Sequence, residues 1–116
     1  MWLRDYHVDG LRIDAVHAIS DASATHILAE LTAEVRTLAA HLRRTLMVIA
    51  ESDLIDCKLV ASPDAGGYGL DACWADYWHH ALHGALTGER TGYYRDYGPL
   101  PVLARAVSQA WSRYPA

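Results

Sequence analysis

Two short apolar segments, each ending at a carboxylate, constrain the fold of this chain more than any other feature. The first, residues 11–15, contains Arg12 and Asp14, and the second, residues 46–50, is followed at once by Glu51. Segments this short and this apolar are typical of strands in a parallel sheet that is buried on both faces. We therefore expect two parallel strands that each deliver a carboxylate at the carboxyl end.

The region between these segments has the pattern of one amphipathic helix. Its apolar side chains recur at helical spacing, at Ile27, Leu28, Leu31, Val35, Leu38 and Leu42. The opposite face carries Glu30, Glu34, Arg36 and Arg43. Asp21 or Ser23 is the expected N-terminal cap. A strand, a helix and a strand with short connections form a right-handed unit, so the two strands are expected to pair in parallel.

The rest of the chain continues the alternation of strands and helices. A long loop follows Glu51 and contains Pro63 and several glycines; loops of that length in compact domains are usually functional. Further on we expect a turn or short strand near residues 58–60, a third strand over 70–76 that ends at Asp76, a helix over 77–86 and a last helix over 102–111. This order predicts an α/β fold. A complete (β/α)8 barrel, or TIM barrel, needs about 250 residues, so the 116 residues here are expected to form a partial one.

The spacing of the two carboxylates suits hydrolysis of a glycosidic bond. Neighbouring strands lie about 4.8 Å apart, and retaining glycosidases need their two carboxyl groups about 5 to 5.5 Å apart. Arg12 points to the same face as Asp14 and would keep it ionised as a nucleophile, while a less polar pocket would let Glu51 serve as acid and base. The alternative is an ordinary Arg12–Asp14 ion pair and a Glu51 that only caps the next segment.

These residues resemble the α-amylase superfamily of glycoside hydrolases. The resemblance is carried by Gly10-Leu11-Arg12-Ile13-Asp14, as in the family's fourth barrel strand, and by Ile49-Ala50-Glu51, as at the end of its fifth. Within the superfamily, residues 6–19, 50–53, 69–83 and 87–94 are similar to the family of malto-oligosyltrehalose trehalohydrolases. The resemblance implies strands 4 to 6 of one catalytic (β/α)8 domain that includes residues 1–116.

The same resemblance implies an activity and a substrate. It implies hydrolysis of the α-1,4 bond next to the trehalosyl end of malto-oligosyl trehalose, with release of trehalose and with no cofactor. A third catalytic aspartate, in an Asn-His-Asp context, belongs to the family pattern, and no such segment is present in these 116 residues. The alternatives are a glucan branching enzyme or another enzyme of the α-amylase type, and, from a different class, a noncatalytic α/β module or inactive barrel piece.

Several further side chains are candidates for contact with substrate. They are Arg12, His17, Asp76, His79, His80 and Trp74. Each has a plainer interpretation, because tryptophans also fill helix and barrel interfaces and histidines also pack or face solvent. His79 and His83 lie four residues apart on the expected helix, but without an adjacent glutamate or third ligand they do not predict a metal site. Tyr93, Tyr94 and Tyr97 lie in a loop, where they could line subsites or cover backbone.

Composition excludes several partners. The net charge is −4 and Lys58 is the only lysine, so no basic stripe is available for nucleic acid or for a membrane surface. Cys57 and Cys73 are too few for a disulfide framework and are expected to be reduced, in a cytoplasmic protein. No signal peptide is visible. We expect the isolated 116 residues to be inactive and poorly soluble or oligomeric, since part of a barrel leaves strand edges and apolar faces open.

Overall fold

The computed structural model describes residues 1–54 and 56–108, which form two compact units. The first unit consists of Met1–Ser52 and Cys57–Trp74. The described residues of the second unit are 53–54, 56 and 75–108.

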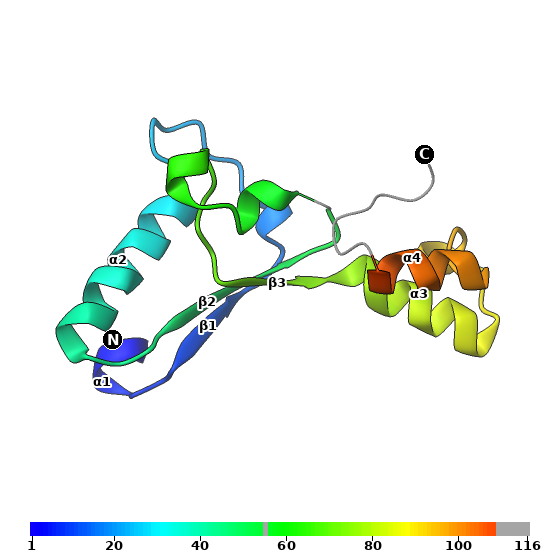
Figure 1. Cartoon of the computed structure of the whole chain (residues 1–116), viewed down its shortest axis with the longest axis horizontal. Helices are drawn as coiled ribbons and strands as arrows, with labels where there is room; N and C mark the ends of the chain where they lie inside the picture. The colour runs from blue at the N-terminus through cyan, green and yellow to red at the C-terminus, as the bar shows by residue number, and fades with distance from the viewer. Residues whose placement is uncertain (55, 109–116) are drawn as a thin grey trace. The chain divides into compact units, whose positions relative to one another are not determined.

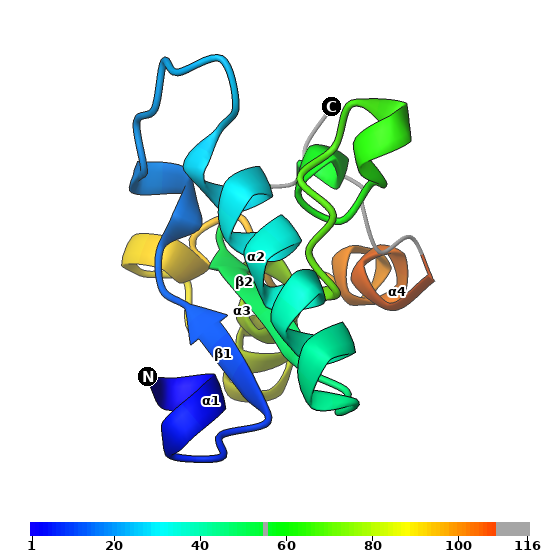
Figure 2. The same cartoon turned by 90° about the vertical axis from the view of Figure 1, so that its left-hand side faces the viewer.

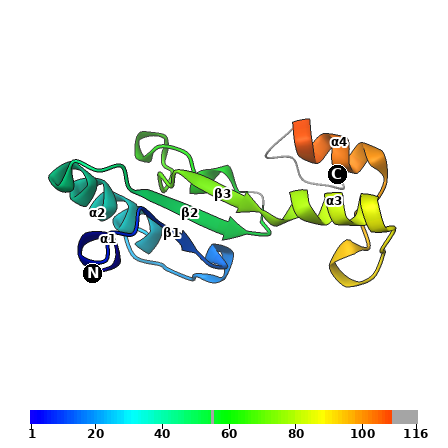
Figure 3. The same ribbon diagram turned by 90° about the horizontal axis from the view of Figure 1, so that it is seen from below.

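A parallel sheet organises the first unit. Its strands are β1 (Gly10–Ile13), β2 (Met47–Ser52) and β3 (Ala72–Ala75), in the order β1-β2-β3 (Figures 1 and 3). β1 and β2 pair in parallel with Arg12 opposite Ile49 and Ile13 opposite Ala50. The predicted strand, helix and parallel strand are therefore confirmed, and the α/β class with them.

Helix α2 (Ile27–Leu42) covers one face of this sheet, as Figure 2 shows from the side. Its buried residues Leu28 and Val35 belong to one core with Val48 and Ala50 of β2. Full burial of a Leu or Val side chain contributes about 1.5 to 3 kcal/mol, so this contact fixes the helix on the sheet. The periodicity of the sequence predicted this face correctly except at Ile27, which is 46% exposed.

The cap of α2 differs from the prediction. His26 is the N-cap residue, and its Nδ1 accepts a hydrogen bond from the Leu28 amide at 3.2 Å. Asp21 still contributes, because its Oδ2 accepts from the Ile27 amide at 2.6 Å. A carboxylate six residues back reaches the helix because the loop turns at Ser23, whose amide and hydroxyl both donate to Asp21 Oδ1.

Within the first unit, the opposite face of the sheet is open. Arg12, Met47 and Trp74 are exposed on it, whereas Val48, Ala50 and Ser52 are buried on the α2 side. Within this unit, the prediction that the strands are buried on both faces is thus met on one face only, since none of its described helices covers the other. The residues that alternate onto this open face are the ones that carry the candidate chemistry.

The loop between β2 and β3 folds into short helical turns rather than a strand. They are η2 (Cys57–Leu59) and η3 (Pro63–Ala65). Arg36 of α2 was expected on the solvent face but donates to the Gly69 carbonyl at 2.6 Å, because the loop returns past the helix. The N-terminal elements are α1 (Trp2–Asp5) and η1 (Val16–Ala18).

The second unit is a helical pair with its own small core. It contains α3 (Asp76–Thr87), η4 (Gly92–Tyr94) and α4 (Leu100–Ser108). Tyr77 and Ala81 of α3 are buried with Val102 and Ala106 of α4. The third strand was expected to end at Asp76, but this residue begins α3 instead.

Helix α3 ends at Thr87, one residue beyond the predicted end at Leu86, and Gly88 follows it as the C-cap in the left-handed conformation (φ 75°). The last three residues of the expected final helix, 109–111, lie outside the described residues. Within the described ranges, no helix is both long and apolar enough to cross a membrane.

Candidate active site

Asp14 follows β1 directly and is held by the arginine two residues before it. Arg12 Nη2 donates to Asp14 Oδ1 at 2.9 Å, which confirms that both side chains lie on the same face of the strand. The Asp14 side chain is 76% exposed. An accessible carboxylate beside a guanidinium has the geometry that a nucleophile needs.

Glu51 lies on the neighbouring strand at the matching height. The β1–β2 register ends with Ile13 opposite Ala50, and one further step along both strands brings Asp14 opposite Glu51. Glu51 belongs to β2 itself, which continues to Ser52, rather than following the strand as predicted. Its side chain is only 20% exposed, and its Oε2 lies 3.9 Å from Arg12 Nη1. One guanidinium therefore neighbours both carboxylates.

The backbone amide of the residue after Asp14 is hydrogen-bonded to the Glu51 carboxyl group. Ala15 N donates to Glu51 Oε2 at 2.7 Å, and Ala15 adopts the left-handed conformation with φ 45° and ψ 47°. Non-glycine residues in this region are strained by about 1 to 2 kcal/mol. The turn directly after Asp14 therefore aims its amide at Glu51, a contact that the sequence did not predict and that no local motif reveals.

Two other predicted residues contact this group. The Trp74 ring lies 5.1 Å from the Arg12 guanidinium carbon in a cation–π contact and remains 59% exposed. His17 is exposed, and its Nδ1 lies 3.3 Å from the hydroxyl of buried Ser52. Trp74 thus supports the arginine while keeping an open aromatic surface, and His17 lies beside the end of β2.

The remaining predicted residues, Asp76, His79 and His80, belong to the second unit. Asp76 Oδ1 lies 3.4 Å from His79 Nε2, one turn along α3, and the Asp76 side chain is 16% exposed. The rings of His79 and His80 are 4.7 Å apart. Burial, and then the neighbouring His79, lower the pKa of His80 below its usual value, so this imidazole is neutral at pH 7.

His83 has a structural role at the end of α3. Its Nε2 lies 2.8 Å from Glu89 Oε2, and its ring stacks on Tyr94 with centroids 4.1 Å apart. The hydrogen bonds from His83 and Thr91 lower the pKa of Glu89. Across the described residues, no group of three or more His, Cys, Asp or Glu side chains is arranged to hold a metal ion.

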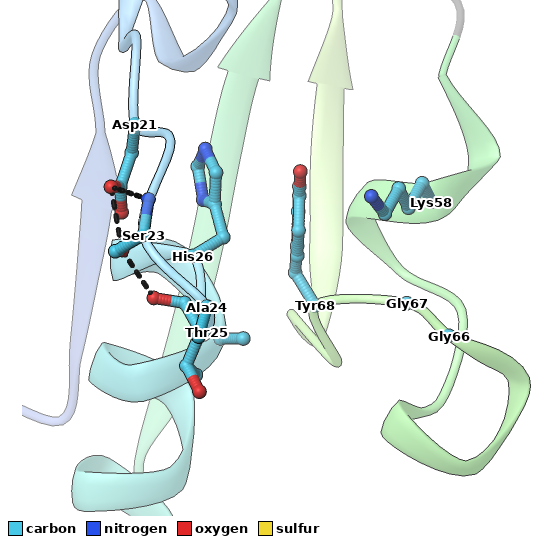
Figure 4. A pocket seen from close by; sticks show the side chains of 10 residues that line it. Asp21, Ser23, Ala24, Thr25, His26, Lys58, Gly66, Gly67 and Tyr68 are labelled. Carbon is cyan, nitrogen blue, oxygen red and sulfur yellow. Dashed lines mark hydrogen bonds between the residues drawn. The ribbon is translucent and has the colours of Figure 1, made fainter.

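A separate hollow of about 320 Å³ lies where the N-terminus of α2 meets the loop of η2 and η3. Figure 4 shows the His26 and Tyr68 rings side by side in it, and their centroids are 4.4 Å apart. Lys58 Nζ lies 4.8 Å from the centre of the Tyr68 ring. None of the predicted site residues lines this hollow.

Comparison with solved structures finds a similar arrangement in a protein of the α-amylase type. A crystal structure of a Salmonella typhimurium protein assigned as an alpha amylase superposes with a TM-score of 0.77 and 34% identity. The match covers 95% of this chain and 19% of that one. The scan against family models gave no match.

Curated relatives with similar sequences share one name within this type of protein. Malto-oligosyltrehalose trehalohydrolase from Arthrobacter ramosus is 56% identical over 110 residues, 95% of this chain and 19% of that relative. The protein of the same name from Mycobacterium tuberculosis H37Rv is 52% identical with the same coverage, and that from Saccharolobus solfataricus is 48% identical over 95% of this chain and 18% of its own length. The chain is homologous to one segment of the malto-oligosyltrehalose trehalohydrolases and spans about a fifth of their length.

Proposed function

We propose that this chain carries the nucleophile and the acid/base of a retaining glycoside hydrolase. The observation that carries the proposal is the β1–β2 register, in which Ile13 pairs with Ala50; continued by one residue beyond β1, it sets Asp14 opposite Glu51. Strands 4.8 Å apart give the separation of about 5 to 5.5 Å that retention requires. The open face of the sheet supports a second proposal, that residues 1–116 are strands 4 to 6 of one (β/α)8 catalytic domain whose interior this face lines.

The chemistry divides between the two carboxylates. Asp14 attacks the anomeric carbon, the glycosidic C–O bond breaks, and Glu51 gives its proton to the departing oxygen. Water then attacks the glycosyl–Asp14 ester while Glu51 takes up the water proton, which restores both groups and retains the anomeric configuration. Arg12 orients Asp14 through their hydrogen bond, and its other terminal nitrogen lies 3.9 Å from Glu51 Oε2, so one guanidinium neighbours both reacting groups.

The proposed substrate is malto-oligosyl trehalose, cleaved at the α-1,4 bond next to its trehalosyl end so that trehalose leaves first. The names of the relatives support this choice. Arg12, His17 and Trp74 are the proposed substrate contacts from the first unit. Asp76, His79 and His80 are those from the second. A cytoplasmic location agrees with the two free cysteines and stays a proposal.

Incubation of the full-length protein with malto-oligosyl trehalose tests the function. We expect release of trehalose, and proton NMR of the first product should show a new reducing end in the α configuration. New α-1,6 branch points without trehalose would instead indicate a branching enzyme. Absence of any change in the glucan would favour a noncatalytic module.

A further inference from the structure

The end of β2 carries a buried hydroxyl group directly after Glu51. Side chains alternate between the two faces of a strand, so Glu51 lies on the open face of the sheet and Ser52 on the α2 side. Ser52 is 1% exposed. A buried hydroxyl is costly unless it is hydrogen-bonded, and Ser52 Oγ lies 3.3 Å from Nδ1 of His17, 35 residues earlier in the chain. The chain thus places a polar contact between the end of β2 and the turn that follows β1.

His17 lies in η1, three residues after Asp14, and its side chain is exposed. Its neighbour Val16 is 3% exposed and belongs to the core of the first unit, so the backbone of this turn is anchored. An exposed imidazole on such a turn has several rotamers available. A hydrogen bond to a group inside a strand restricts them, whether the hydroxyl or the ring donates the hydrogen.

We propose that Ser52 is a positioning residue, which acts on the substrate through His17. The inference rests on the proposed function, in which His17 contacts the glucan. Ser52 is too deeply buried to touch a substrate itself. A ring that is already held in one orientation loses less freedom when the substrate binds, so the hydrogen bond lowers KM. Together with the bond from Ala15 N to Glu51 Oε2, it fixes the turn after Asp14 to the end of β2 at two points.

A double-mutant cycle in the full-length protein tests this role. It compares Ser52→Ala, His17→Ala and the variant with both changes, and kcat and KM are measured with malto-oligosyl trehalose. Thr32→Val is the matched control, because Thr32 is also buried, at 2%, and its hydroxyl donates to the Leu28 carbonyl within α2. Thermal melts verify folding, and both Ser52→Ala and Thr32→Val should melt at a lower temperature because each loses one buried hydrogen bond.

For Ser52→Ala we expect KM to rise by about two- to tenfold, the range of one hydrogen bond, with kcat unchanged because a binding contact acts equally on substrate and transition state. The double variant should have the KM of His17→Ala alone, since no ring remains for Ser52 to hold. Thr32→Val should keep the KM of the wild type. An unchanged KM in Ser52→Ala, additive losses in the double variant, or an equal rise of KM in Thr32→Val would overturn the proposal.

A crystal structure of the Ser52→Ala protein separates this inference from the proposed function. We expect the His17 ring to leave its present orientation in Ser52→Ala and to keep it in Thr32→Val. A reoriented ring, in a protein whose wild type releases no trehalose, would leave Ser52 as the residue that positions His17 and sink only the proposed function. An unmoved ring would overturn the positioning role, whatever the substrate.

Discussion

Replacement of Glu51 by glutamine should abolish acid catalysis while leaving the fold intact. The amide oxygen of glutamine can accept the same hydrogen bond from Ala15 N that Glu51 Oε2 accepts at 2.7 Å. What is lost is the attraction to Arg12 across 3.9 Å, worth about 1 kcal/mol in a dielectric close to that of water. Ion pairs with a partner as exposed as Arg12, at 40%, contribute about 0 to 1 kcal/mol. The free energy of unfolding should therefore change by at most about 1 kcal/mol.

The expected effect on activity is much larger. A positioned general acid or base contributes about 10²- to 10⁴-fold, and glutamine can neither give nor take the proton at the glycosidic oxygen. Turnover of malto-oligosyl trehalose by Glu51→Gln should fall by that factor. Turnover by Asp14→Asn should fall by at least the same factor, because this variant cannot form the covalent glycosyl ester.

An activated substrate separates the two roles. Fluoride leaves α-maltosyl fluoride without a proton, so Glu51→Gln should still form the glycosyl ester and release about one fluoride per active site in a burst. Asp14→Asn should show no burst. The assignment would be refuted by a wild-type rate of Glu51→Gln on malto-oligosyl trehalose, or by a fluoride burst in Asp14→Asn. Urea unfolding of all three proteins checks that stability is not the cause.

Two further predictions concern stability and are measured by unfolding of the full-length protein. Arg43 is the C-cap residue of α2 and has the left-handed conformation at φ 52°, so Arg43→Gly should raise the free energy of unfolding by about 0.5 to 1 kcal/mol. Glu34→Gly, inside the helix, should lower it by about 1 kcal/mol. A lower free energy of unfolding in Arg43→Gly would contradict this. Hydrogen bonds from Ser23 and then Ile27 lower the pKa of Asp21 to about 2. The stability that this lowered pKa contributes is present above pH 4 and is lost as pH falls toward 2. Asp21→Asn should therefore make the free energy of unfolding depend less on pH in that range. An unchanged dependence would show that Asp21 does not stabilise the fold in this way.

The sequence predicted the features that depend on the spacing of apolar residues and on the order of strands and helices along the chain. Two apolar segments separated by one amphipathic helix required a parallel pair, and the spacing of Asp14 and Glu51 matches the register by which β1 pairs with β2. The pairing of Arg12 with Asp14 followed from the two-residue repeat of a strand. These relations need no knowledge of distant partners, which is why they could be predicted.

Features that depend on distant partners were missed. His26 replaced the predicted caps because its ring is also held against Tyr68, 42 residues away in the chain. Arg36 left the solvent face because the loop before β3 offers it the Gly69 carbonyl. The end of β2 shifted past Glu51 because the strand continues until Ser52 is buried. In each case tertiary contact overrode a local preference that the sequence alone could express.

The turn at Ala15 joins Asp14 and Glu51, the proposed nucleophile and acid/base, into one structural unit. Alanine in the left-handed region is strained by about 1 to 2 kcal/mol, and an intramolecular hydrogen bond contributes about 0.5 to 1.5 kcal/mol. The Ala15–Glu51 bond is therefore of the size needed to hold a turn that alanine alone disfavours. Since that turn begins directly after Asp14, removal of the Glu51 side-chain oxygens would let Asp14 move as well. Truncation of Glu51 to alanine would thus confuse the loss of an acid with the displacement of a nucleophile, whereas glutamine, which keeps the bond from Ala15, separates them.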